Sequence, residues 1–335
     1  MTTERVTNKE QIHEFSKAIH DATPESIAAI LGEYYADDVD WHGPHPVNEL
    51  GGVAAVAEGY WKPLLDSFPD VEKNDYVLFG GEYEGSEWVV ATGNLVGTFE
   101  NDWFGIPATG HATWLRYGAF HEFEDGDIVQ TRLFVDILDV LRQAGYEFAP
   151  ALAPEVVIPG PTTQDGVLLG EQDPKASEQT LQLVEDMIFD GLNSYEDEGL
   201  DGMGMERYWH EDFMWYGPAG IGTTRGIDGF QDFHQGPFLE AFPDRTGGNH
   251  VARFAEGNYC ASTGWPSVEA THTGSGWLGL PATGDPVEMR VMDVWRREGD
   301  KLAENWVFID MLDLLLQMGI DVFERLEEHP RSIRS

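Results

Sequence analysis

The sequence predicts an α+β fold built from two tandem copies of one cone-shaped domain. Landmark residues recur 174 positions apart without a gap for most of the chain, for example Trp41 and Trp215. Within each copy, helical patterns come first and a run of strand patterns follows, an order typical of one antiparallel sheet with helices on a single face. A curved sheet covered in this way leaves a cavity open at one end, and that cavity is the expected ligand site.

The repeat is far too long for a solenoid unit, so each copy is expected to be a whole domain with its own core. The expected boundaries are residues 1–148 for the first domain, 149–176 for a proline-rich linker, and 177–335 for the second domain. The repeated landmarks are Phe68-Pro69-Asp70 with Phe242-Pro243-Asp244, Trp103 with Trp277, Gly105 to Gly110 with Gly279 to Gly284, Asp136 with Asp310, and Asp139 with Asp313.

The elements of the first copy are predicted from the spacing of apolar residues and from residues that start helices or form turns. Apolar residues at helical spacing predict helices over about 9–20 and 51–68, and Thr23-Pro24 supplies the start of a helix between them. Alternating patterns predict strands over 39–42, 76–79, 88–98, 112–123 and 128–136, with a hairpin turn at 124–127 and a closing helix from Asp139. The second copy repeats this order, with a helix over 177–193, a turn at 297–300 and a last strand over 302–310.

The charge balance is unusual, with 60 acidic and 20 basic residues and a net charge of −40. Such a field repels phosphate backbones and anionic membranes, so we expect no nucleic-acid or membrane partner. Adaptation to salt explains the charge, because counterions screen the self-repulsion, and a solubility-tuned acidic protein is the alternative. The single cysteine, Cys260, cannot form an intramolecular disulfide, and no stretch reaches 18 apolar residues, so a soluble cytoplasmic protein is expected.

The last strand of each copy carries the clearest candidate chemistry. Period two places Arg132 and Asp136 on one face, and Glu304, Trp306 and Asp310 on the matching face of the second copy. A carboxylate among apolar residues is desolvated and its pKa raised, which suits general acid or base work near neutral pH. The alternative is that both aspartates only cap the following helix, since Asp is a favoured N-cap.

The set of motifs, from Phe-Pro-Asp through Gly-x-Pro-x-Thr-Gly to the strand Asp and Gln-x-Gly, resembles the SnoaL-like polyketide cyclases, also called predicted ester cyclases, of the NTF2-like superfamily. The resemblance covers about residues 8–148 and 177–325. It implies the NTF2-like cone and a cofactor-free aldol condensation in which Asp136 or Asp310 moves the proton. Thr271-His272 matches the family's Gly-Thr-His stretch in the second copy only, and His42-Gly43-Pro44 matches its early His-x-Pro in the first only.

The expected catalytic groups are therefore Asp310 with His272 in the second copy, and Asp136 with Arg132 or His42 in the first. No cofactor and no metal are expected, and the partner would be a small hydrophobic carbonyl compound. A ligand-binding protein without turnover, or one active domain beside a degenerate one, remains an alternative. Because NTF2-like domains commonly pair through their sheets, the two copies would form an intramolecular pseudo-dimer, compatible with a monomeric chain. Arg116 and Arg290, which match between the copies, are expected in packing or inter-domain contacts.

Overall fold

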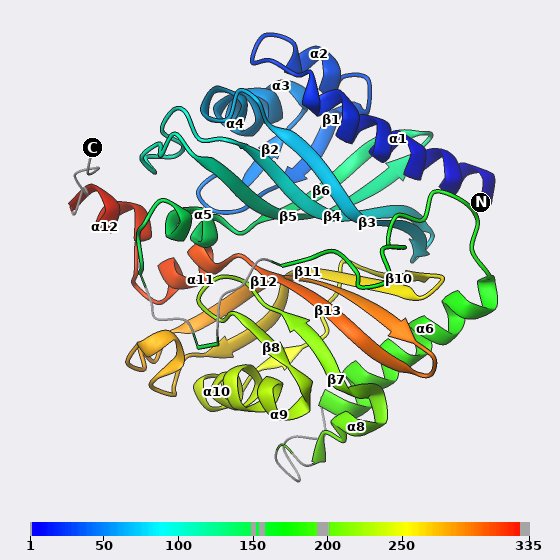
Figure 1. Cartoon of the computed structure of the whole chain (residues 1–335), viewed down its shortest axis with the longest axis vertical. Helices are drawn as coiled ribbons and strands as arrows, with labels where there is room; N and C mark the ends of the chain where they lie inside the picture. The colour runs from blue at the N-terminus through cyan, green and yellow to red at the C-terminus, as the bar shows by residue number, and fades with distance from the viewer. Residues whose placement is uncertain (1, 149–151, 154–157, 193–199, 201, 329–335) are drawn as a thin grey trace.

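The computed structural model describes residues 2–148, 152–153, 158–192, 200 and 202–328. The chain forms two halves that stack with their sheets facing each other and most of their helices on the outer sides, while the short helices α5 (Ile137–Gln143) and α11 (Met311–Gln317) lie at the boundary (Figure 1). Each half is a curved sheet with helices on one face, which confirms the predicted α+β cones. No helix among the described residues is long and apolar enough to cross a membrane.

The first half begins with helices, continues into a four-stranded meander and closes with a short helix. Its elements are α1 (Thr2–His20), α2 (Ile27–Leu31), β1 (Tyr35–His42), β2 (Glu49–Gly51), α3 (Val53–Val56), the π-helical turn η1 (Ala57–Trp61), α4 (Lys62–Ser67), β3 (Glu72–Tyr83), β4 (Ser86–Thr98), β5 (Ala112–Glu124), β6 (Asp127–Val135) and α5 (Ile137–Gln143). The helix predicted over 51–68 is thus one helical segment interrupted by a π-helical turn.

The second half repeats this order within the described residues. Its elements are α6 (Pro174–Asp186), the π-helical turn η2 (Met187–Gly191), α8 (Met205–Tyr208), β7 (Trp209–Tyr216), β8 (Thr223–Arg225), α9 (Gly226–Phe230), the π-helical turn η4 (Gln231–Gln235), α10 (Gly236–Ala241), β9 (Thr246–Gly247), β10 (Ala252–Glu256), β11 (Tyr259–Thr271), the 3₁₀ turn η5 (Trp277–Gly279), β12 (Pro286–Glu298), β13 (Lys301–Ile309), α11 (Met311–Gln317) and α12 (Val322–Glu328).

The two sheets share one topology. The first has the order β2-β1-β6-β5-β4-β3 and the second β10-β11-β12-β13-β7-β8, with β9 beside β11. Most neighbours are antiparallel, but β1 runs parallel to β6 and β7 parallel to β13. The expectation of purely antiparallel sheets therefore needs a correction at one strand pair in each sheet. Alternation within a strand shows which residues share a face, and it carries no information on the direction of the neighbouring strand.

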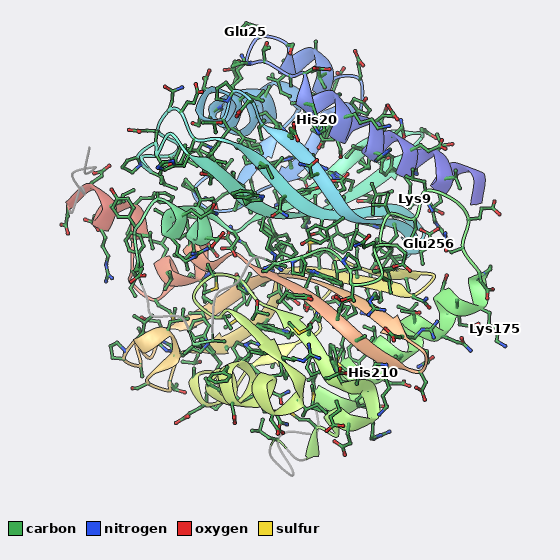
Figure 2. The ribbon with its side chains drawn as sticks, in the orientation of Figure 1. Lys9, His20, Glu25, Lys175, His210 and Glu256 are labelled. Carbon is green, nitrogen blue, oxygen red and sulfur yellow. The ribbon has the colours of Figure 1, made fainter. Side chains whose placement is uncertain are left out.

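A cluster of buried apolar side chains lies between the two sheets. Its buried members come from both halves: Val77, Phe79, Trp88, Val90, Phe120, Phe134, Tyr216, Ala252, Phe254, Tyr259, Ala261, Met292, Val294, Trp306 and Phe308. Polar contacts cross the same boundary, including the buried ion pair of Lys9 Nζ and Glu256 Oε1 at 2.6 Å (Figure 2). Each sheet is therefore covered on both faces, on one by the helices of its own half and on the other by the sheet of the opposite half.

This arrangement decides which strand residues face a cone. In β13, Trp306 and Phe308 belong to the cluster between the sheets, so the even-numbered residues point away from the helices. The odd-numbered residues Asn305, Val307 and Ile309 line the interior of the second cone. The face predicted to carry the chemistry is thus the face between the two halves.

Candidate functional site

Asp136 and Asp310 lie at the boundary between the halves. Asp136 caps α5, accepting from the Asp139 N–H at 3.1 Å, and its other oxygen accepts from the Ala219 N–H of the second half at 2.9 Å. Asp310 caps α11 in the same way and accepts from the His45 N–H of the first half at 2.9 Å. Burial raises the pKa of each carboxyl to about 6. Each aspartate therefore caps a helix, as the alternative interpretation predicted, and each also forms a hydrogen bond that links the two halves.

The other three candidates are not brought to these aspartates. The ring of His272 packs against Phe242, and its Nδ1 lies 3.3 Å from Thr283 Oγ1. His42 and Arg132 are register partners on β1 and β6. His42 Nε2 bonds Asp40 Oδ2 at 2.9 Å, however, and the Arg132 guanidinium lies 5.9 Å from the centre of the Trp265 ring. Among the described residues, neither aspartate forms a hydrogen bond or an ion pair with its expected partner, so the structure brings neither expected catalytic pair into contact.

The interior of the second cone holds a cavity of about 270 Å³. Its walls are mainly apolar and aromatic and include a few polar side chains. The described residues that line it are Met187, Ile188, Leu192, Met205, Trp209, Trp215, Phe230, His234, Phe238, Arg245, Gly247, Gly248, His250, Ser262, Ser267, Val268, Met289, Val291, Asp293, Trp295, Asn305, Val307 and Ile309. An apolar cavity with a small number of converging polar groups is the usual form of a small-molecule site.

Among the described residues that line this cavity, Asp293 carries the carboxyl group. It sits in β12 between Ser262 of β11 and Val307 of β13, so the sheet fixes its position from both sides. Desolvation raises its pKa to about 7, while a hydrogen bond from Asn305 Nδ2 to Oδ1 at 3.2 Å acts in the opposite direction. Asn305 is itself held by a second bond, from Nδ2 to the Val294 carbonyl at 3.1 Å. A carboxyl group so placed exchanges its proton near neutral pH.

Two histidines complete the polar side of the cavity. His234 stacks on Trp215 with ring centres 4.0 Å apart, and burial lowers its pKa to about 3. Burial, helped by the charge of Arg253, lowers the pKa of His250 to about 4. Arg253 Nη1 donates to His250 Nδ1 at 2.7 Å, which leaves the ring proton on Nε2. Both imidazoles are therefore neutral at pH 7 and can each donate one hydrogen bond.

The first cone is filled instead of open, with a residual cavity of about 10 Å³. The Lys73 ammonium occupies its polar interior and bonds Asp75 at 2.7 Å, Tyr117 Oη at 2.7 Å and Ser16 Oγ at 2.6 Å. The three polar groups of the second cone are replaced at the matching positions of the first: Ala119 stands for Asp293, Thr131 for Asn305 and Tyr60 for His234. The two cones are thus alike in fold and different in chemistry.

Sequence reasoning missed Asp293 although a signal was present. It is a lone acid in an otherwise apolar stretch, Val291-Met292-Asp293-Val294-Trp295, inside a predicted strand. Comparing the two copies emphasised what both had kept, and Asp293 is present in one copy alone. A comparison of the two copies therefore gives no signal for Asp293, which lies on β12, the strand before β13.

The structure defines the chain as a tandem protein with two α+β cone domains, of which the second holds an open cavity. Two family models match it, the SnoaL-like polyketide cyclase at residues 198–318 and the SnoaL-like domain at residues 7–131. The chain belongs to the SnoaL-like family and carries two copies of its domain. No curated protein matches the chain.

Solved structures with a similar chain each correspond to less than half of this protein. A protein described as a SnoaL-like polyketide cyclase from Jannaschia sp. CCS1 is 16% identical, with 46% of this chain and 99% of that chain covered and a TM-score of 0.38. An NTF2-like protein from Burkholderia xenovorans LB400 is 18% identical, with coverages of 42% and 97% and a TM-score of 0.33. One from Burkholderia thailandensis E264 is 21% identical, with the same coverages and TM-score.

Proposed function

We propose that the second cone catalyses cofactor-independent proton transfer at a carbon next to a carbonyl group, in the service of a cyclisation or isomerisation. Asp293 is the general base, and the single observation that carries the proposal is its carboxyl group, with a pKa raised to about 7, in a cavity of about 270 Å³. A base with a pKa near the working pH is ionised and still basic enough to remove a proton from carbon.

The neighbouring groups have distinct parts in this reaction. Asn305 positions the Asp293 carboxylate, because both of its amide contacts, to Asp293 and to the Val294 carbonyl, fix the side chain against the sheet. His234 donates a hydrogen bond to the enolate oxygen as negative charge develops there. A neutral donor in a site shielded from water stabilises such an oxyanion without having to lose a proton. Trp215 and Phe238 hold the apolar body of the substrate.

The first domain has a structural part in this proposal. Its cone is closed by the Lys73 and Asp75 ion pair, and the position of the base is Ala119. Its sheet supplies part of the cluster between the domains, including Phe79 and Phe120, and so supports the back of the catalytic sheet. This corresponds to one active domain beside a degenerate one.

A proton-exchange assay tests the proposal without knowledge of the natural substrate. The probe is 2-tetralone, a small apolar ketone, in deuterated buffer, and NMR follows the loss of its α-protons. The protein should accelerate exchange above the buffer rate, with a rate that falls below an apparent pKa of about 7, the value of Asp293. Saturable binding of the ketone without any acceleration would contradict catalysis and favour the ligand-binding alternative.

A further inference from the structure

The sheet of the second cone carries a row of polar side chains of which the proposed reaction uses one. Arg253 of β10 pairs with Ser262 of β11, and Ser262 pairs with Asp293 of β12. Paired residues of neighbouring strands share a face of the sheet, so all three side chains lie on the face turned toward the cone. Arg253 and Asp293 are two strands apart, a backbone separation of about 10 Å.

The matching row of the first cone is apolar. Leu78 pairs with Ala91, and Ala91 pairs with Ala119, the counterpart of Asp293. All three belong to the buried apolar cluster that also contains the inner faces of α1 and α4. Since the first cone is filled and the second is open, the polar row accompanies the open cavity and is not a requirement of the fold.

Ser262 places a hydroxyl group on the cavity wall. The residue is 2% exposed and lines the cavity, while its neighbour Ala261 lies in the cluster between the sheets. Within the described part of the chain, its Oγ has no hydrogen-bond partner, and it is not among the polar atoms sealed away from any probe. A hydroxyl in this position can donate a hydrogen bond to a molecule in the cavity.

His250 is a second donor on the same side of the cavity, and its ring is held from behind. Arg253 Nη1 donates to His250 Nδ1 at 2.7 Å, and the same guanidinium donates to Glu185 Oε1 from Nε at 3.0 Å and from Nη2 at 2.8 Å. These contacts fix the imidazole and leave its proton on Nε2. His250 lines the cavity, and its Nε2 has no partner among the described residues.

The first domain helps to hold this side of the cavity in place. Glu256, three residues after Arg253 on β10, accepts from Lys9 Nζ at 2.6 Å and from the Gly80 N–H at 2.8 Å (Figure 2). The Tyr83 ring of the first half lies 5.7 Å from the Arg253 guanidinium. The position of the guanidinium that holds the imidazole therefore depends on the contact between the domains.

The cavity thus has donors on both sides of the base. The strand order is β10-β11-β12-β13-β7, with Asp293 on the central strand β12. His234 stacks on Trp215 of β7, at one end of this order, and Ser262 and His250 lie toward β10, at the other end. A bound molecule that meets the base at its middle can therefore accept hydrogen bonds at two separate places.

We propose that Ser262 and His250 bind a second oxygen of the substrate, an ether or carbonyl oxygen at the end remote from the reacting carbon. This inference rests on the proposed function, since it takes Asp293 as the base and His234 as the donor to the reacting carbonyl. Ser262 and His250 then determine specificity, and Arg253 is a positioning residue that acts through His250. A contact that is equally strong in the ground state and the transition state lowers KM and leaves kcat unchanged.

Matched pairs of ketones test the proposal. The probes are 6-methoxy- and 7-methoxy-2-tetralone, whose ether oxygen lies on the ring remote from the reacting carbon, each compared with its ethyl analogue of similar size. Calorimetry measures Kd, and exchange of the α-protons measures kcat and KM. At least one methoxy ketone should bind about 3- to 10-fold more tightly than its ethyl analogue, the size of one neutral hydrogen bond. Its KM should be lower by the same factor, while the two kcat values agree within about 2-fold.

Three variants assign this preference to the named residues. Ser262→Ala removes the hydroxyl and His250→Phe replaces the imidazole by a ring without an N–H, and each should lower the preference at least about 2-fold. Arg253→Met leaves the imidazole present but no longer fixed, and it should lower the preference in the same way. In each folded variant, kcat for the ethyl ketones should stay unchanged, a separation of KM from kcat that a general loss of structure would not give.

Equal affinities of the methoxy and ethyl ketones for the unaltered protein would overturn the proposal. So would a preference that persists in the Ser262→Ala, His250→Phe double variant. Asp293→Asn distinguishes this inference from the proposed function, because calorimetric binding does not require proton transfer, and the variant should keep the preference in Kd. A preference in Kd without exchange of any ketone by the unaltered protein would contradict the proposed reaction and still support the oxygen-binding role of Ser262 and His250.

Discussion

The carboxylate of Asp136 accepts a hydrogen bond from the backbone N–H of Ala219, a residue of the other half of the molecule, at 2.9 Å. Asp310 and His45 repeat the relationship at 2.9 Å in the opposite sense. Each aspartate also caps the helix that follows its own strand. One residue type at one repeated position therefore starts a helix and joins the two domains.

Replacing Asp136 by Ala should destabilise the protein by about 2–4 kcal/mol, because the change removes an N-cap and leaves the buried Ala219 N–H without an acceptor. Asp136→Asn should cost less, since the amide oxygen still accepts. Chemical denaturation measures both. Asp66→Ala, at an exposed helix position, is the matched control and should change the free energy of unfolding by less than about 0.5 kcal/mol. Equal stability of Asp136→Ala and the control would show that these two hydrogen bonds of Asp136 do not stabilise the protein.

The tandem fold could be predicted because the duplication is visible when the two halves of the sequence are compared, and because the periodicity that marks each helix and strand is local. The strands predicted over 88–98 and 112–123 are observed as Ser86–Thr98 and Ala112–Glu124, and this part of the prediction is confirmed. The short strands β2, β8 and β9 were missed, since two or three residues carry no measurable alternation.

The site was harder to predict because both faces of each sheet are buried. In β13, Trp306 and Phe308 face the other half while Val307 and Ile309 face the cone, so hydrophobicity did not distinguish the inner from the outer face. Alternation shows which residues share a face and gives no information on what covers that face. Asp293 faces the cone because the first half covers the opposite face of its sheet, and no local pattern in the sequence contains that information.

Lys73 should matter for stability and not for catalysis. Its replacement by Met leaves Asp75 charged and without its ion-pair partner in a buried site, which costs about 3–5 kcal/mol. The free energy of unfolding measures the loss, and ketone exchange per folded molecule should stay unchanged. A Lys73→Met, Asp75→Leu double variant should recover part of the stability, because no lone charge remains. Loss of exchange in a folded Lys73→Met protein would instead show that the first cone takes part in the reaction.

Asp293 should make stability depend on pH with a definite sign. Its pKa is about 7 in the folded protein against an ordinary value of 3.8, so the folded state binds this proton more tightly and ionisation opposes folding. Stability contributed by the group is present below about pH 4 and is lost as the pH rises to about 7. Relative to Asp293→Asn, the unaltered protein should therefore lose up to about 1.4 kcal/mol per pH unit in this window. A constant difference between the two proteins across these pH values would contradict the raised pKa.

Added salt should stabilise the protein. A net charge of −40 opposes compaction in dilute buffer, and the screening length falls from about 10 Å at 0.1 M to about 3 Å at 1 M salt. Thermal melts in dilute buffer and in 2 M potassium chloride measure the effect, and the midpoint should be higher in salt. Equal midpoints would mean that the acidic surface does not limit stability.

The most direct test of the account compares two identical substitutions, Asp293→Asn in the cone and Asp310→Asn at the domain boundary, in the exchange of 2-tetralone α-protons. Both carboxyl groups have a raised pKa, so a difference between the two variants reports on the position of the carboxyl group and not on its pKa. Asp293→Asn should lower the exchange rate at least about 100-fold, the low end for loss of a general base, while Asp310→Asn stays within about 3-fold of the unaltered protein. Full exchange by a folded Asp293→Asn protein, or its loss in Asp310→Asn alone, would contradict the assignment of Asp293 as the base.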